Sequence, residues 1–246
     1  MNRLKKVMTM ALLAIASVSC NAQTSVKEKL ATATKEGKTV LMVVSDKNNP
    51  SANLKTLAQS ATASEKNIAI IEMDKDSEAN STLVNEYRIG SAPMPLLLVF
   101  SNKGLLLSGM TEEQATKEAI IDALPTPKYS EISYALSQAK PVFALISNTS
   151  FKSDKDALAL CSDAKSDILN GAEIIEIDAK DETESKLLTM LNIKTKLKDS
   201  YIVAINGQGI MSGRFDKLPS KDELIEAATK VVQSGCAPGG CTPSCQ

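Results

Sequence analysis

Short apolar runs alternate with segments of helical periodicity along most of this chain. Val40 to Val44, Ile68 to Met73 and Leu96 to Phe100 have the length and the apolar content of buried strands. The segments between them repeat apolar residues at the spacing of a helix that covers one face of a sheet. The pattern therefore predicts an α/β fold in which helices flank a central sheet on both faces.

The second half of the chain repeats the pattern of the first. Three pairs of segments match in the same order: KTVLMVVS (38–45) with KPVFALIS (140–147), IIEMD (70–74) with IIEID (174–178), and LLLVFSNKG (96–104) with YIVAINGQG (201–209). The separation between partners changes by only one or two residues from pair to pair. Collinear matches of this kind predict a duplicated domain.

Each copy predicts the order β-α-β-α-β-β-α after one preceding helix. The Asn and Gly residues of SNKG and NGQG suit a tight hairpin turn between the last two strands. We expect one domain over residues 24–125 and a second over 128–233, each with a mixed central sheet flanked by helices. Residues 234–246 contain prolines and glycines that cannot continue a helix, so we expect a flexible tail there.

The first 22 residues have the pattern of a secretory signal peptide. Arg3, Lys5 and Lys6 precede an apolar run from Val7 to Val18 that is too short to span a bilayer. The following ASVSC is similar to a bacterial lipoprotein box and makes Cys20 a lipidation candidate, while cleavage after Ala22 is the alternative. Either reading predicts export, to the periplasm or the outer membrane, with membrane attachment only through a lipid anchor.

Composition excludes several classes of function. The chain has 28 Lys+Arg against 29 Asp+Glu and no basic stripe after its first six residues, so we expect no nucleic-acid partner. It has no histidine, which excludes His-based triads and His metal ligands. Acidic runs at 74–78 and 178–184 follow buried strands in both copies and indicate solvated loops.

The element order and one motif are similar to those of the thioredoxin-like family. YRIGSAPMPLLLVF, residues 87–100, resembles the segment that leads into the third core strand of that fold, with Pro95 in the position of its cis-proline. Ser200 stands at the matching position of the second copy. The resemblance implies two tandem thioredoxin-like domains.

The resemblance also implies a Cys-x-x-Cys site where the first strand gives way to its helix, and this sequence departs from it. NNPS stands there, with Asn48 and Ser51 at the two cysteine positions and Pro50 retained. The second copy has TSFKS, residues 149–153, also without sulfur. Asn, Pro and Ser favour loops and helix starts; the alternative is a surface that binds extended peptide beside Pro95.

Three cysteines, Cys236, Cys241 and Cys245, are clustered in the tail. Pro238, Gly239 and Pro243 lie between them in turn-forming positions, so the sulfurs can converge. Three thiolates suit Cu(I) or Zn(II). Alternatively, two form a disulfide and the third meets a partner thiol, or the tail is an attachment point.

The remaining cysteine of the mature chain is Cys161. It shares one helical face with Ala157, Ala164 and Ile168, which predicts a small buried side chain.

These features predict a non-catalytic, exported scaffold whose tail captures a soft metal ion or a partner thiol. One alternative is a thiol-disulfide oxidoreductase that uses the tail cysteines. The other is a chaperone-like or structural pair of domains.

Overall fold

The computed structural model describes residues 24–63, 65, 67–193 and 197–232. The predicted signal peptide, Cys20 and the three tail cysteines lie outside the described residues.

The first half contains α1 (Val26–Lys35), β1 (Thr39–Ser45), α2 (Ala52–Ala61), β2 (Ile68–Asp74), η1 (Glu78–Asn80), α3 (Ser81–Glu86), β3 (Leu96–Phe100), β4 (Leu106–Thr111) and α4 (Lys117–Ala123). The second half contains α5 (Pro127–Ser137), β5 (Val142–Ser147), α6 (Asp154–Asp167), β6 (Glu173–Asp178), η2 (Glu182–Glu184), α7 (Ser185–Met190), β7 (Tyr201–Ile205), β8 (Met211–Phe215) and α8 (Lys221–Thr229).

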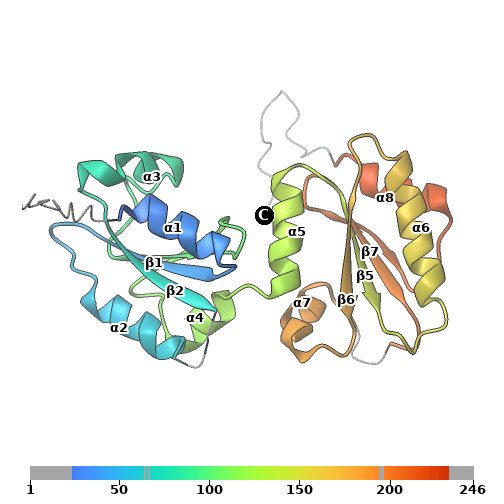
Figure 1. Cartoon of the computed structure of the whole chain (residues 1–246), viewed down its shortest axis with the longest axis horizontal. Helices are drawn as coiled ribbons and strands as arrows, with labels where there is room; N and C mark the ends of the chain where they lie inside the picture. The colour runs from blue at the N-terminus through green and yellow to red at the C-terminus, as the bar shows by residue number, and fades with distance from the viewer. Residues whose placement is uncertain (1–23, 64, 66, 194–196, 233–246) are drawn as a thin grey trace, which may run out of the picture.

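Two separate four-stranded sheets form, one in each half (Figure 1). The first has the strand order β2-β1-β3-β4, and the second has β6-β5-β7-β8. In each, the central strand pairs in parallel with one neighbour and antiparallel with the other, and the last two strands form an antiparallel hairpin. The two halves therefore share one topology, as the repeat predicts.

Helices cover both faces of each sheet. In the first domain, α1 and α3 lie on one face of the sheet and α2 and α4 on the other (Figure 1). Val40, Met42 and Val44 of β1 pack on the side of α1 and α3, whereas Leu41 and Val43 pack against α2 and α4. β5 alternates in the same way between α5 with α7 and α6 with α8. Burial of each large apolar side chain stabilises the fold by about 1.5–3 kcal/mol. The continuous apolar runs of the sequence are thus strands with two buried faces.

The duplication extends to backbone conformation. Arg88 follows α3 and Asn192 follows α7 at matching positions, with left-handed φ values of 54° and 55°. Gly104 and Gly209 occupy matching places in the two hairpin turns with φ values of 79° and 80°. A left-handed residue ends a helix or closes a turn, so the two copies keep the same chain reversals.

The last helix of each copy is shorter than the sequence pattern, which predicts helices from Glu112 to Ala123 and from Lys221 to Val232. The periodicity begins at Glu112, but α4 begins at Lys117 because the Thr116 hydroxyl caps it by accepting from the Ala119 N–H at 3.0 Å. The pattern continues to Val232, but α8 ends at Thr229. The chain after it is held instead by the hairpin turn, where Asn206 Nδ2 donates to the Lys230 carbonyl at 2.7 Å.

Candidate functional site

The candidate site of the first domain lies where β1 ends and β3 begins. Val44 pairs with Leu96, so the loop after Ser45 and the residues just before Leu96 share one edge of the sheet. Pro95 is buried there, and the Met94–Pro95 peptide bond is cis. In the second sheet Ile146 pairs with Tyr201 at the matching edge.

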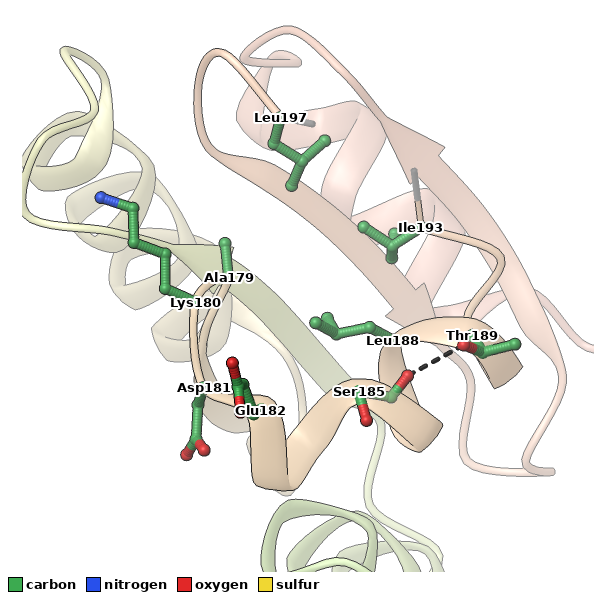
Figure 2. A pocket seen from close by; sticks show the side chains of 9 residues that line it. All are labelled: Ala179, Lys180, Asp181, Glu182, Ser185, Leu188, Thr189, Ile193 and Leu197. Carbon is green, nitrogen blue, oxygen red and sulfur yellow. Dashed lines mark hydrogen bonds between the residues drawn. The ribbon is translucent and has the colours of Figure 1, made fainter. Parts of the chain in front are cut away.

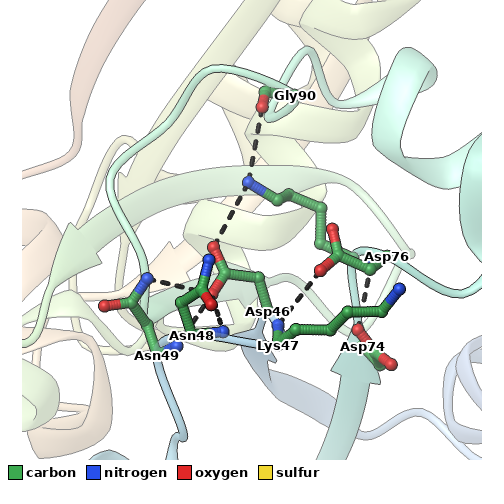
Figure 3. Close-up of polar contacts among 8 residues, drawn as sticks. Asp46, Lys47, Asn48, Asn49, Asp74, Asp76 and Gly90 are labelled. Carbon is green, nitrogen blue, oxygen red and sulfur yellow. Dashed lines mark hydrogen bonds and ion pairs between the residues drawn. The ribbon is translucent and has the colours of Figure 1, made fainter.

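A carboxylate organises the loop after β1 (Figure 3). Asp46 Oδ1 accepts from the backbone N–H groups of Asn48 at 3.0 Å and Asn49 at 2.8 Å, and from Asn49 Nδ2 at 2.9 Å. The side-chain amide of Asn49, these two N–H groups and the nearby Lys75 ammonium lower the pKa of Asp46. The loop is therefore closed by its own hydrogen bonds.

Lys75, directly after β2, ties three loops together. Its Nζ lies 3.6 Å from Asp46 Oδ2 and donates to the carbonyl of Gly90 at 3.4 Å (Figure 3). The side chains of Lys75 and Asp46 are only 17% and 15% exposed. Limited exposure reduces screening by water, so this contact holds the ends of β1 and β2 against the loop after α3.

The structure places the residues at the degenerate Cys-x-x-Cys position as follows. Ser51 is the residue that precedes the first turn of α2, and its side chain makes no capping hydrogen bond. Asn48 lies three residues earlier, exposed, with its backbone bound to Asp46. Pro50 is exposed between them. Only Ser51 thus stands at the helix N-terminus, where the backbone dipole lowers a thiol pKa.

In the second domain, a different carboxylate holds the loop between the first core strand and the following helix. Asp199 Oδ1 accepts from the Ser153 hydroxyl at 2.7 Å, from the Ser153 N–H at 3.0 Å and from the Ser200 N–H at 3.0 Å. The hydroxyl and then the two N–H groups lower the pKa of Asp199. The start of α6 is thereby fastened to the segment before β7.

The sequence interpretation did not identify Asp46 or Asp199. The available signal was local for Asp46, because an Asp side chain in a loop commonly accepts hydrogen bonds from the backbone N–H groups that follow it. Asp199 has no such signal, because its partner Ser153 is 46 residues away. Asp46 binds the backbone of Asn48, and Asp199 binds Ser153, so each carboxylate holds the turn where the resemblance would place the Cys-x-x-Cys site.

Cys161 is fully buried within α6, as its helical spacing predicts. It packs with Ala157, Ala164 and Leu224 in an apolar cluster. Burial, and to a lesser extent the charge of Glu176, raise its pKa to about 12. At neutral pH it is a protonated thiol, which is neither a nucleophile nor a metal ligand.

Residues 24–63, 65, 67–193 and 197–232 form neither a cluster of metal ligands nor a membrane-spanning helix. Within them, no three His, Cys, Asp or Glu side chains come together in a way that could hold an ion. In the same part of the chain, no helix combines the length and apolar content needed to cross a bilayer.

A pocket of about 210 Å³ opens beside the end of β6 in the second domain (Figure 2). It is lined by Ala179, Lys180, Asp181, Glu182, Ser185, Leu188, Thr189, Ile193 and Leu197. The Ala179 N–H donates to the Ser147 carbonyl at 2.9 Å, which places the pocket at the same sheet edge as the loop after β5. This pocket was not foreseen from the sequence.

The topology defines the class of protein. A four-stranded mixed sheet of order β2-β1-β3-β4, covered by helices on both faces and repeated once, is a tandem of two thioredoxin-like domains. The fold expected from the sequence is confirmed. Neither domain carries a cysteine at the turn between its first core strand and the following helix.

Comparison with known proteins gives only distant likenesses. No family model matches the chain, and no curated protein matches it. A disulphide isomerase from Xylella fastidiosa Temecula1 is 17% identical over 50% of this chain and 99% of its own, with a TM-score of 0.29.

Two further solved structures match about four fifths of this chain. The first two thioredoxin domains of Saccharomyces cerevisiae Eps1p are 11% identical over 82% of this chain and 96% of theirs, with a TM-score of 0.29. The zinc-bound form of human ERp44 is 14% identical over 81% of this chain and 55% of its own, with a TM-score of 0.36. At these identities the likenesses concern fold and say nothing about activity.

Proposed function

We propose that this protein is a binding scaffold of two thioredoxin-like domains whose tail cysteines, Cys236, Cys241 and Cys245, capture a soft metal ion or a partner thiol. The observation that carries the proposal is the closure of both sites by carboxylates. Asp46 and Asp199 hold the loops in which a thioredoxin-like redox protein has its reactive thiol. Any thiol chemistry of the present protein would then have to come from cysteines outside these two loops.

Cys161 does not supply that chemistry. Its thiol is buried and keeps its proton at neutral pH. Three tail thiols, spaced by turn-forming residues, can lose their protons together when Cu(I) or Zn(II) binds, with an outside group as fourth ligand for zinc. In the thiol version, one tail thiolate attacks a partner disulfide, forms a mixed disulfide, and the partner's second sulfur leaves as a thiolate.

Metal titration of the full chain tests the metal version. We expect one Cu(I) or Zn(II) per chain in competition with a chromophoric chelator. The binding should be lost when Cys236, Cys241 and Cys245 are all replaced by serine, and retained in Cys161→Ala as the matched control. Unchanged metal binding by the triple variant would contradict the proposal that the tail binds a metal ion.

An insulin-reduction assay on the same variants separates scaffold from enzyme. A rate above background that the three serine substitutions abolish would establish the oxidoreductase alternative. Background rates for the wild type and all variants are the result expected of a scaffold. Normal behaviour of the triple variant in both assays would leave only a chaperone-like or structural role.

We also propose that the protein is exported and that its surface beside Pro95 binds extended peptide. Export rests on the signal-peptide pattern. Peptide binding rests on Pro95, which is itself buried but lies at the same sheet edge as the loop with the exposed Asn48 and Pro50. The mass of the protein isolated from membranes and from the periplasm tests export. An acyl chain on Cys20 would show lipidation, whereas a chain that begins at Gln23 would show cleavage after Ala22.

A further inference from the structure

The strand β4 forms one edge of the first sheet and carries no charged residue. The two sheets have four edge strands in the described part of the chain: β2, β4, β6 and β8. Both β2 and β6 contain aspartate and glutamate, and β8 contains Arg214, whereas β4 reads LLSGMT (106–111). Charged side chains on an edge strand discourage its pairing with another chain. The β4 edge therefore lacks the protection that the other three edges have.

The outer side of β4 has backbone groups that are free to pair. β4 pairs with β3 from Thr111, opposite Leu96, to Leu106, opposite Phe100. Beyond β3, the Thr111 N–H donates to Gln114 Oε1 at 3.0 Å, whereas residues 106–110 form no hydrogen bond with any other described residue. Every second residue of an edge strand directs its N–H and C=O away from its neighbour. This edge thus presents an unused hydrogen-bonding ladder.

A pocket of about 280 Å³ opens directly beside this edge. Leu107 and Met110 of β4 line it from the first domain. Tyr129 of α5, together with Leu187 and Met190 of α7, lines it from the second, and α5 lies between the two sheets in Figure 1. Met190 is 48% exposed, so solvent reaches the pocket. A chain that lies along β4 can place an apolar side chain there.

The charged residues of this pocket favour a neutral occupant. Lys186 and Asp122 are the charged residues that line it, and their charges are opposite. The Lys186 ammonium already donates to the carbonyls of Asp122 and Leu124. A charged side chain that entered the pocket would lose its hydration without gaining an unmatched partner. The pocket is therefore suited to an apolar side chain.

We propose that β4 binds an extended peptide segment as an added strand, with one large apolar side chain of the peptide in this pocket. Backbone hydrogen bonds supply affinity in such strand addition, and the pocket selects the side chain. A second copy of this chain fits less well, because the α5 and α7 residues beside the edge occupy space that a second helix-covered sheet needs. The inference depends neither on the tail cysteines nor on the surface beside Pro95.

Amide NMR on the full chain tests the inference with acetyl-Lys-Thr-Val-Leu-Val-Thr-Lys-amide as the probe. We expect saturable shifts at 106–111 and at the pocket residues. At saturation, hydrogen exchange should slow about ten-fold or more at alternate amides of β4, because those amides join the added strand. The peptide with serine in place of leucine should bind about ten-fold more weakly. The peptide methylated at the nitrogens of its five central residues cannot join the ladder and should give no saturable shift.

Matched variants locate the binding site. Met190→Asp places a carboxylate in the pocket and should weaken binding of the leucine peptide about ten-fold or more. Met211→Asp, at a similarly exposed methionine on the β8 edge, should leave binding unchanged. The two methionines are 48% and 43% exposed, so neither change disturbs a core. Ser108→Lys adds a charge to the exposed edge and should weaken binding of the leucine and serine peptides alike.

Several results would overturn the proposal. Equally tight binding of the methylated peptide would assign the pocket to apolar groups without strand pairing. Shifts confined to residues 46–51 would place the peptide beside Pro95 instead. A concentration-dependent dimer in sedimentation, with the same β4 amides slowed in the absence of peptide, would make a second copy the occupant. The absence of any saturable shift would show that the edge binds no extended peptide of this kind.

Discussion

Cys161 is a structural cysteine, and its buried thiol is not reactive. It lies at the centre of α6 against apolar neighbours, and its pKa is raised to about 12. The helical spacing of alanines around it predicts this burial, because a small side chain is needed where α6 meets the sheet. Burial, and with it the raised pKa, follows from packing and gives no sign of catalysis.

We predict that Cys161 does not react in the native state. In a variant whose other four cysteines are serine, 5,5′-dithiobis(2-nitrobenzoate) at pH 8 should give no reaction until urea unfolds the chain, because only the thiolate attacks and the side chain is inaccessible. Immediate reaction in native buffer would contradict both the burial and the raised pKa.

The Cys161 thiol also makes the stability of the folded protein depend on pH. Its pKa is higher in the folded state than the ordinary value near 9, so the folded state holds the proton more tightly. The associated stability is complete below pH 9 and is lost as the pH rises toward 12. Relative to Cys161→Ala, the free energy of unfolding should fall by roughly 1 kcal/mol between pH 8 and pH 10. Urea titrations at the two pH values measure it.

At the scale of elements, the strands were predictable and the site was only partly so. The runs at 40–44 and 142–146 specify β1 and β5 within one residue, because strands buried on both faces need nearly continuous apolar sequence. The start of α4 depends on the Thr116 cap, which periodicity does not register. The anchoring of α6 by Asp199 depends on a contact across 46 residues, which no local pattern encodes.

The position of the α2 N-terminus predicts how the degenerate site would respond to restored sulfur. We expect Ser51→Cys to give a thiol with a pKa below about 7.5, since it stands at the N-terminus of a ten-residue helix. Asn48→Cys should keep a pKa near 8.5 or above, because it precedes the helix by three residues and lies beside the Asp46 carboxylate.

The pH dependence of iodoacetamide alkylation measures both values, in a background where the tail cysteines are serine. Cys161 stays in place because it is buried. The two variants are matched, since each adds one thiol to the same exposed loop region. A lower pKa for the cysteine at position 48 than for the one at position 51 would show that the start of α2 does not govern this site.

At the scale of the whole molecule, the two domains have separate cores. Each of the four clusters of buried apolar residues draws its members from one half of the chain only. Among the described residues, Lys186 Nζ crosses between the halves and donates to the carbonyls of Asp122 and, at 3.0 Å, of Leu124. Leu107 and Met110 of the first half line the pocket beside β4 together with Leu187 and Met190 of the second. Such contacts orient domains without building a shared core.

We therefore predict that each half folds alone, as fragments 24–125 and 126–232. Each buries both faces of its own sheet, so each should show a cooperative urea transition and dispersed amide resonances. The second fragment has to keep Thr126, whose hydroxyl caps α5 by accepting from the Tyr129 N–H at 3.2 Å. A fragment that begins at residue 128 lacks this cap and should be less stable by about 0.5–2 kcal/mol. Fragments that fold only when mixed would show that the polar contacts of Lys186 are part of a single cooperative unit, and the duplicated sheets would then be one domain in energetic terms.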